Sequence, residues 1–175
     1  MSSKTVLVVA AFVVTLLMAG GSYAQQSNPL DVVPEKMPFD IAYGAPISLE
    51  RADAVLAAAI AESKKHDWKL NCAVFDSGAN LVSFKRMDGA QLASISVAQH
   101  KARAAAKFRR ETKAYENGVE LTKLNSLITL DDVIASRGGI PLVEDGKIIG
   151  AIGCSGGAGS QDEVGAKAGA ALINK

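Results

Sequence analysis

The 175-residue chain is 49% hydrophobic and 21% charged. This composition is typical of a globular protein with a buried core, and it excludes a disordered or low-complexity chain. The 19 basic and 18 acidic side chains give a net charge of +1. A chain without a strong positive field has no general means of holding nucleic acid or an anionic membrane, so we expect neither as a partner.

The N-terminus has the pattern of a secretory signal. Lys4 precedes an apolar run from Val6 to Leu17, and Ser22-Tyr23-Ala24 has small residues at the two positions that matter before a cleavage site. The run is shorter than the ~20 residues of a membrane-spanning helix. We therefore expect residues 1–24 to be removed rather than kept as an anchor, which leaves a periplasmic or secreted protein without stable membrane insertion.

Residues 25–47 predict an N-terminal arm, because they carry four of the five prolines and lack apolar periodicity. The domain is expected over residues 48–175. Ser48 is a favoured N-cap, and apolar residues recur behind it at helical spacing, so the first helix is predicted over 49–65. Residues 70–76 and 81–86 then read as a hairpin around Gly78 and Asn80.

The second half of the domain continues this mixture of helices and strands. An alanine-rich helix is predicted over about 92–109, lying close to whatever it covers, and Thr112 is a favoured cap for a third helix running toward Lys123. Residues 141–144 and 147–154 form a second hairpin across Asp145-Gly146. A final helix starts with Asp162 and Glu163 in its first turn. We predict an α+β fold in which helices pack on a mainly antiparallel sheet.

Cys72 and Cys154 lie in two of the apolar strands. In an oxidising compartment they could form a disulfide, but a free thiol also packs well as a small hydrophobic side chain, and the sequence leaves both alternatives open. Together with His66 and His100 they match no zinc-site spacing, so we expect no structural zinc.

A basic run marks the second helix and the residues after it. A run of this kind is usually a solvent-exposed helix face, but it could also form the cationic edge of a binding site for a small diacid or for the propionates of haem. Four side chains are of a type that binds haem iron, although each is more often a plain surface or packing residue. The basic run comprises Lys101, Arg103, Lys107, Arg109, Arg110 and Lys113, and the four are His66, His100, Tyr115 and Met87.

Signals for catalysis are weak. No nucleophile elbow is present, and the glycine-rich loop over 153–160 lacks the pattern of a nucleotide-binding loop. Asp76, Arg86 and Asp88 near strand ends could act as acid, base and clamp, yet residues of these types are also common in turns and ion pairs. We expect binding rather than catalysis.

Several strings in the right order resemble the GlcG/HbpS family, which includes the C-terminal domain of PduO-type corrinoid adenosyltransferases. The resemblance covers the chain from Ser48 to the C-terminus. The strings are Ala73-Val74-Phe75-Asp76-Ser77-Gly78, Phe84-Lys85-Arg86-Met87-Asp88-Gly89-Ala90, Ala98-Gln99-His100-Lys101-Ala102, Gly138-Gly139-Ile140-Pro141, Ile149-Gly150-Ala151-Ile152-Gly153-Cys154-Ser155-Gly156 and Gln161-Asp162.

The resemblance implies a profilin-like sandwich with a five-stranded antiparallel sheet, self-assembly into homo-oligomers and, for some members, haem in a cleft between subunits. In the haem-binding branch a threonine after the second helix lies at the iron, and Thr112 matches that position. We therefore expect an exported haem- or tetrapyrrole-binding protein. In it, Arg109 and Arg110 hold the propionates, Lys101 adds to the same basic surface, and His66, His100 or Thr112 faces the iron.

Two alternatives stay open. The first is an enzyme or binding protein for a carboxylate metabolite such as glycolate, because other family members are tied by context to glycolate, diol or aromatic catabolism. Its pocket would be lined by Asp76, Arg86 and Asp88 beside Gly138-Gly139. The second is a structural or regulatory oligomer in which the basic helix is a contact surface.

Overall fold

A computed structural model describes residues 31–174 of the chain. Residues 36–174 lie within one compact unit, and residues 31–35 belong to a separate N-terminal unit and are exposed. The predicted signal segment, residues 1–24, lies outside the described residues. Within residues 31–174 no helix is both long and apolar enough to cross a membrane.

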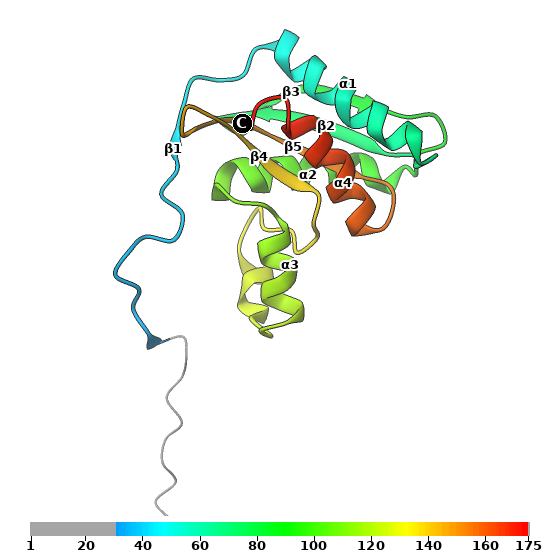
Figure 1. The fold of residues 1–175 in the computed structure, drawn as a ribbon. Coiled ribbons are helices and arrows are strands. Elements are labelled where there is room, and N and C mark those ends of the chain that lie inside the picture. The colour runs from blue at the N-terminus through cyan, green and yellow to red at the C-terminus, as the bar shows by residue number, and fades with distance from the viewer. Residues whose placement is uncertain (1–30, 175) are drawn as a thin grey trace, which may run out of the picture. The chain divides into compact units, whose positions relative to one another are not determined.

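The compact unit alternates helices with two hairpins (Figure 1). In chain order its elements are β1 (Ala42–Tyr43), α1 (Leu49–Lys65), β2 (Asn71–Asp76), β3 (Leu81–Arg86), α2 (Ala93–Phe108), α3 (Lys113–Glu120), the 3-10 helix η2 (Asn125–Thr129), β4 (Gly139–Glu144), β5 (Lys147–Ser155) and α4 (Gly159–Ala170).

β5 is the central strand of a five-stranded sheet. It pairs antiparallel with β2 along one edge and with β4 along the other, and β3 follows β2. β1 pairs parallel with Lys147 and Ile148 at the start of β5, and β4 pairs with the same two residues from the opposite side. β1 therefore lies on the same side of β5 as β2. Every residue of β5 after Lys147 is buried. The mainly antiparallel sheet and its buried central strand are therefore confirmed.

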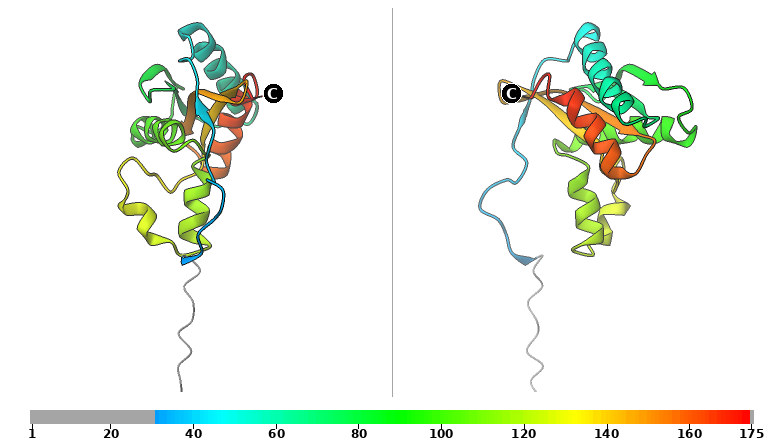
Figure 2. Two further views of the ribbon diagram at one scale, coloured as in Figure 1. Left: turned by 90° about the vertical axis from the view of Figure 1, so that its left-hand side faces the viewer. Right: turned by 45° about the vertical axis from the view of Figure 1, so that its right-hand side comes forward.

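Helices cover both faces of the sheet. Figures 1 and 2 show α1 and α4 on one face and α2 on the other. The α1/α4 side holds the larger apolar cluster, with branched side chains such as Val55, Leu56 and Ile152. On the α2 side a Cβ built on Gly153 would overlap the Ala98 carbonyl oxygen. The predicted close approach of the alanine-rich helix is thus confirmed, because its backbone rests directly on a glycine of the sheet.

A disulfide joins the two central strands. Cys72 and Cys154 stand directly opposite each other in β2 and β5, with 4.2 Å between their Cα atoms, and their sulfur atoms are bonded. Both side chains are fully buried in the cluster beneath α1 and α4. Of the two alternatives that the sequence leaves open, the structure has the disulfide.

The start of the compact unit differs from the predicted arm. Residues 36–47 belong to this unit and include β1, which the sequence patterns miss because two residues are too few for any periodicity. Backbone hydrogen bonds continue past β1, from Gly44 N to Ile148 O (2.8 Å) and from Ile47 N to Ile149 O (2.9 Å). Ser48 then caps α1 as predicted, its hydroxyl accepting a hydrogen bond from Arg51 N.

Candidate functional site

A groove lies where the segment before β1 passes the C-terminal end of α2. It has a volume of about 280 Å³. We call it the arm–α2 groove, and it is lined by Met37, Pro38, Phe39, Lys107, Phe108, Arg109 and Arg110. Aromatic and aliphatic side chains thus lie beside three cationic ones. All seven lining residues come from the two chain segments 37–39 and 107–110.

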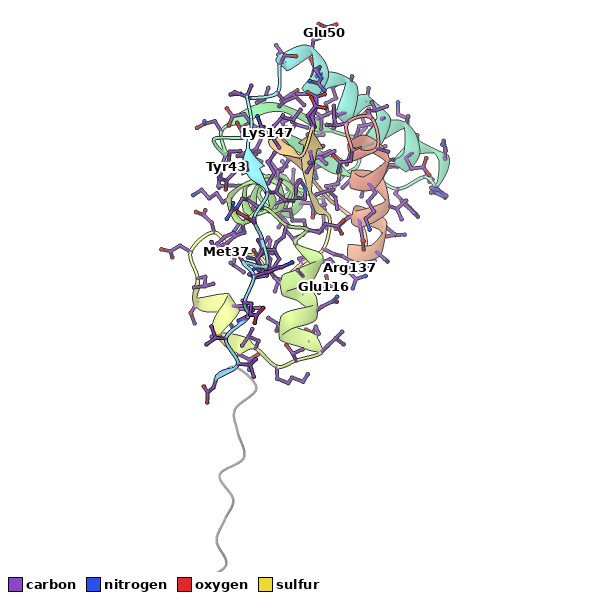
Figure 3. All side chains as sticks on the ribbon, turned by 60° about the vertical axis from the view of Figure 1, so that its left-hand side comes forward. Met37, Tyr43, Glu50, Glu116, Arg137 and Lys147 are labelled. Carbon is purple, nitrogen blue, oxygen red and sulfur yellow. A yellow bond between two sulfur atoms is a disulfide. The ribbon has the colours of Figure 1, made fainter. Side chains whose placement is uncertain are left out.

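Hydrogen bonds tie the two walls of the arm–α2 groove together. The Tyr43 hydroxyl donates to the carbonyl oxygens of Ala106 (3.2 Å) and Lys107 (2.8 Å), which belong to the last turn of α2. Carbonyls at this end of a helix lack partners within the helix, so a donor from another segment satisfies them. Arg109 Nη1 returns a bond to Ile41 O at 3.2 Å. Figure 3 shows Met37 and Tyr43 along this segment.

Arg110 is stacked among aromatic rings. Its guanidinium carbon lies 3.0 Å from the centre of the Phe39 ring and 5.4 Å from that of Tyr115, and its Nε donates to Phe108 O at 3.1 Å. Burial lowers the pKa of Arg110 from its ordinary value. The side chain is nevertheless charged, because arginine is not deprotonated in proteins. Arg109 ends α2 in the left-handed conformation, and its guanidinium lies 5.7 Å from the Tyr43 ring centre.

The arginines of the arm–α2 groove have no acidic partner within residues 31–174. Neither Arg109 nor Arg110 forms an ion pair with a carboxylate of the described residues. Lys107, in contrast, is paired with Asp132, and this hydrogen bond lowers the pKa of that carboxyl. No described carboxylate therefore neutralises these two partly buried guanidinium groups, and the donors not used by Ile41 O and Phe108 O can bind an anionic ligand.

Tyr115 packs against the groove residues Phe108 and Arg110. In the sequence it was one of four side chains of a kind that can bind haem iron. Its side chain is 2% exposed and packs edge-on to Phe108, with 5.6 Å between ring centres. Its hydroxyl has no hydrogen-bond partner among the described residues, and burial raises the pKa of Tyr115 to about 12. A buried hydroxyl that stays protonated and unpaired is uncommon, because it forgoes its hydrogen bond with water.

Lys101 is not part of the exposed basic surface, which corrects our expectation. It is 1% exposed, and its Nζ lies 2.7 Å from Asp162 Oδ2. Ala98, Lys101, Ala102 and Ala105 share the spacing of one helical stripe, and this stripe faces the sheet. That spacing was the signal in the sequence that Lys101 is buried.

Thr112 is fully buried and also lies outside the arm–α2 groove. Its hydroxyl accepts a hydrogen bond from Gly139 N (2.9 Å), and its own N–H donates to Gly139 O (3.0 Å). Thr112 occupies the N-cap position of α3, as predicted, but its hydroxyl makes no capping bond to the helix. Within one chain, Thr112 holds the start of β4 in place.

Neither histidine lines the groove. His66 follows α1, stacks on Trp68 with 4.4 Å between ring centres, and lies 3.3 Å from a Glu62 oxygen through Nε2. His100 is half-buried on α2. Among residues 31–174, no group of three or more His, Cys, Asp or Glu side chains is placed to hold a metal ion.

Of the three residues of the carboxylate hypothesis, Asp76 lies apart from Arg86 and Asp88. Arg86 pairs with Asn71 at one end of β2, whereas Asp76 is at the other end, where its carboxylate accepts a hydrogen bond from Asn80 N at 2.9 Å. Gly138 and Gly139 pack against Asp162, Lys101 and Thr112 rather than beside these residues. Asp76 is therefore a turn residue in this structure.

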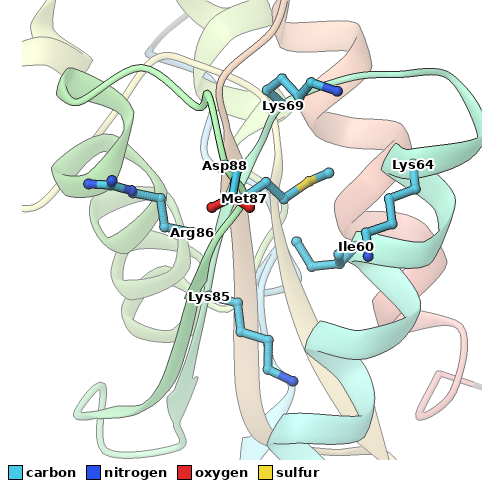
Figure 4. Close-up of a pocket in the computed structure, with 7 residues that line it drawn as sticks. All are labelled: Ile60, Lys64, Lys69, Lys85, Arg86, Met87 and Asp88. Atoms are coloured by element: carbon cyan, nitrogen blue, oxygen red, sulfur yellow. The ribbon is translucent and has the colours of Figure 1, made fainter.

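Arg86 and Asp88 line a second hollow, of about 490 Å³, between α1 and the end of β3. Met87, an iron-ligand type in the sequence, lies here and not near the arginines of the arm–α2 groove. We call this hollow the α1–β3 pocket (Figure 4), and its lining consists of Ile60, Lys64, Lys69, Lys85, Arg86, Met87 and Asp88.

Comparison with known proteins adds a family to this geometry. A family model described as haem degrading protein HbpS-like matches residues 47–171. The chain belongs to this HbpS-like family. Protein GlcG of Escherichia coli K12 is 41% identical over 109 residues, which cover 62% of this chain and 81% of the relative. An uncharacterised 15.0 kDa protein of Citrobacter freundii is 32% identical over 124 residues, 69% of this chain and 87% of that protein.

Solved structures confirm the fold. A double mutant of Streptomyces reticuli HbpS superposes with a TM-score of 0.70 at 25% identity, covering 82% of this chain and 99% of that one. A complex of PduOC with haem gives a TM-score of 0.66 at 27% identity, covering 74% of this chain and 96% of the other. The resemblance to the GlcG/HbpS family is thereby confirmed.

Proposed function

We propose that this protein is an exported haem-binding protein and that the arm–α2 groove receives the porphyrin. Haem is a flat apolar macrocycle with two propionates, so its site needs apolar walls beside cations. Phe39 and Phe108 supply such walls, and Arg109 and Arg110 supply cations that no carboxylate of the described residues pairs with. This juxtaposition carries the proposal. Membership of the HbpS-like family and the haem complex of PduOC support it.

Each side chain would have a distinct role. The planar guanidinium groups of Arg109 and Arg110 are suited to bidentate bonds with propionates. Phe39 and Phe108 would contact the macrocycle, and the unpaired Tyr115 hydroxyl lies behind Arg110 as a further donor. Bound haem would supply an iron centre with its own ligand chemistry.

The iron ligand is proposed to come from a second copy of the chain. His66, His100 and Thr112 do not line the arm–α2 groove of their own protomer. Thr112 is fully buried and its hydroxyl is bonded to Gly139 N, so the two histidines are the candidates. A homo-oligomer in which His66 or His100 reaches the groove of a neighbour would complete the site and would exclude water from both faces of the macrocycle. This arrangement predicts that haem binding and self-association are coupled.

Export is part of the same proposal. Disulfides persist in oxidising compartments and are rare in the cytosol, so the buried Cys72–Cys154 bond supports an exported protein. The pattern of residues 1–24 is that of a secretory signal. Mass spectrometry of the protein recovered from the periplasm or medium should give an N-terminus at Gln25, whereas an intact N-terminus would contradict cleavage.

Titration of the mature chain with haemin tests the proposed ligand. We expect a saturable shift of the Soret band, and a loss of affinity of about a hundredfold or more in the double variant Arg109→Gln, Arg110→Gln, because each of the two lost charge-assisted hydrogen bonds costs about 1.5 to 3 kcal/mol. The matched control Lys64→Gln, Lys85→Gln removes two charges from the α1–β3 pocket and should bind haemin normally. No Soret shift, or equal losses in both double variants, would contradict the proposal.

The same titration also distinguishes the fate of the haem. A binding protein keeps its Soret band over hours in air with a mild reductant, which together supply the dioxygen and electrons that oxidative cleavage of the porphyrin consumes. A haem-degrading protein, which the description of the family names, loses the band under the same conditions. We expect the Soret band to persist, because uptake, storage and sensing all require that the bound haem stays intact.

A further inference from the structure

We propose that the α1–β3 pocket is a second ligand site, which binds a small organic anion with an apolar body. The pocket is formed by Ile60 and Lys64 near the end of α1, by Lys69 in the following loop, and by the chain from Lys85 to Asp88. It shares no residue with the arm–α2 groove, so the proposal does not depend on haem binding.

Three lysines surround this pocket. Figure 4 shows Lys64, Lys69 and Lys85 on the α1 side of β3, whereas the Arg86 side chain extends away from them. The side-chain ammonium groups of Lys64 and Lys85 form no hydrogen bond or ion pair with any described residue, and that of Lys69 is paired with the exposed Asp67. Asp88 is the single acidic residue of the lining. The hollow therefore carries an excess of positive charge.

This charge is not explained by helix ends alone. Lys64 lies in the last turn of α1, where a cation is favoured by the helix dipole, but Lys85 is a strand residue. Lys64, Lys69 and Lys85 are exposed, so solvent screens their mutual repulsion, but a concave surface strengthens their combined field. A bound anion would relieve this repulsion.

The floor of the pocket is apolar and fixed. Ile60 and Met87 pack against the main core cluster. Met87 is held further by its own N–H, which donates to Leu70 O at 3.1 Å, and by its sulfur, which accepts from Leu70 N at 3.4 Å. A ligand seated here would place an aliphatic or aromatic body on Met87 and Ile60, with its anionic group between the lysine ammonium groups.

The lysines indicate the class of the anionic group. An ammonium group acts as a point charge with rotatable donors, so it binds tetrahedral phosphate and planar carboxylate alike. The planar fork of arginine is more selective in geometry. We expect an organic phosphate or carboxylate to bind. Phenyl phosphate carries a phosphate and benzoate a carboxylate, each on a phenyl ring. Inorganic phosphate has the anionic group without the ring, and phenol has the ring without the anionic group.

Isothermal titration of the mature chain with these four compounds tests the proposal. Phenyl phosphate and benzoate should bind more tightly than inorganic phosphate and phenol. In methyl NMR spectra, the shifted signals should be those of Ile60 and Met87. The double variant Lys64→Gln, Lys85→Gln should lose about tenfold in affinity for phenyl phosphate.

Two charge-matched controls isolate the pocket. Lys36→Gln with Lys147→Gln removes two exposed lysines elsewhere, and Arg109→Gln with Arg110→Gln removes the cations of the arm–α2 groove. Both should bind phenyl phosphate as the parent chain does. The proposal is overturned if phenyl phosphate does not bind at millimolar concentration, if inorganic phosphate binds equally well, if the shifted methyl signals belong to other residues, or if a control variant weakens binding as much as the Lys64, Lys85 variant.

Discussion

The two faces of the central sheet hold their helices by different means. Beneath α1 and α4, branched side chains and the Cys72–Cys154 disulfide fill the space. Beneath α2, the backbone of the helix rests on glycines, with Ala98 and Ala102 on Gly153 of β5 and Lys101 on Gly139 of β4. The side chain of Lys101 forms a buried pair with Asp162. The first face depends on apolar volume and a covalent bond, and the second on close backbone approach and exact charge pairing.

This difference matters for the proposed haem site. The arm–α2 groove is built on the last residues of α2, so any shift of α2 on the sheet moves Arg109 and Arg110 with it. The α1–β3 pocket is built on the other face and rests on the larger apolar cluster. Changes under α2 should therefore disturb haemin binding before they disturb the α1–β3 pocket.

Breaking the buried ion pair should have the largest effect. Lys101→Met leaves the Asp162 carboxylate buried without its counter-charge, which costs about 3 to 5 kcal/mol in free energy of unfolding. Urea denaturation at pH 7.5 measures this loss. A variant that also carries Asp162→Leu should recover most of it, because no charge is then buried alone. Failure of the double variant to recover would show that the lysine acts through its packing.

The pH dependence of the Lys101→Met variant sharpens this prediction. Burial already raises the pKa of Asp162, and the charge of Lys101 opposes that rise. Without Lys101 the folded carboxyl binds its proton more tightly still than the unfolded one, so stability falls as pH rises through the folded pKa. The variant should therefore be closer to the parent chain at pH 4.5 than at pH 7.5. A loss that does not depend on pH would contradict the role of the carboxylate.

Removing the disulfide should be the next largest effect, on the opposite face. Cys72→Ala with Cys154→Ala should lower the free energy of unfolding by about 3 kcal/mol, because a cross-link over 82 residues restricts the unfolded chain. The folded double variant should still bind haemin with the affinity of the parent chain, since α2 is on the other side of the sheet. Loss of haemin affinity in this variant at temperatures where it is folded would contradict the separation of the two faces.

A single added methyl group under α2 should have a smaller but more specific effect. A Cβ at residue 153 would overlap Ala98 O and approach the Cα of Ala102 to 3.0 Å, so Gly153→Ala must push α2 away. We expect a loss of about 2 kcal/mol in free energy of unfolding and weaker haemin binding. Ile152→Val, which trims the other face of the same strand by one methylene, is the control and should leave haemin affinity unchanged.

The smallest effect is expected at the residue after Asp162. Burial alone would raise the pKa of Glu163, but hydrogen bonds from Lys167 and Lys113 outweigh burial and lower it. Arg137, which lies beside Glu116 in Figure 3, also reaches Glu163 at 3.5 Å. Glu163→Gln should cost about 1 kcal/mol at pH 7. Because the folded pKa is lowered, this difference should disappear as pH falls through it.

The sequence contains most of the information on local elements. The helix over 49–65, its cap at Ser48 and both hairpins follow from short-range patterns that the structure confirms. β1 escaped because its two residues become a strand only by pairing with Lys147 and Ile148, more than 100 positions later. Lys101 belongs both to the basic run and to the buried stripe of α2, and its burial depends on pairing with Asp162, which is 61 positions away in the sequence.

The sites depend on contacts that no local pattern contains. Arg109 and Arg110 could be named from the basic run, but Met37, Pro38 and Phe39 join them only because β1 and Tyr43 hold that segment against α2. Lys64, Lys69 and Lys85 come from a helix, a loop and a strand. Their meeting in one pocket is a property of the tertiary structure.

A crystal structure of the mature chain grown with haemin tests the central claim most directly. We expect the porphyrin in the arm–α2 groove against Phe39 and Phe108, with its propionates on Arg109 and Arg110 and its iron facing a residue of a second copy. A porphyrin bound elsewhere, with both arginines still stacked on Phe39 and Tyr43, would contradict the claim.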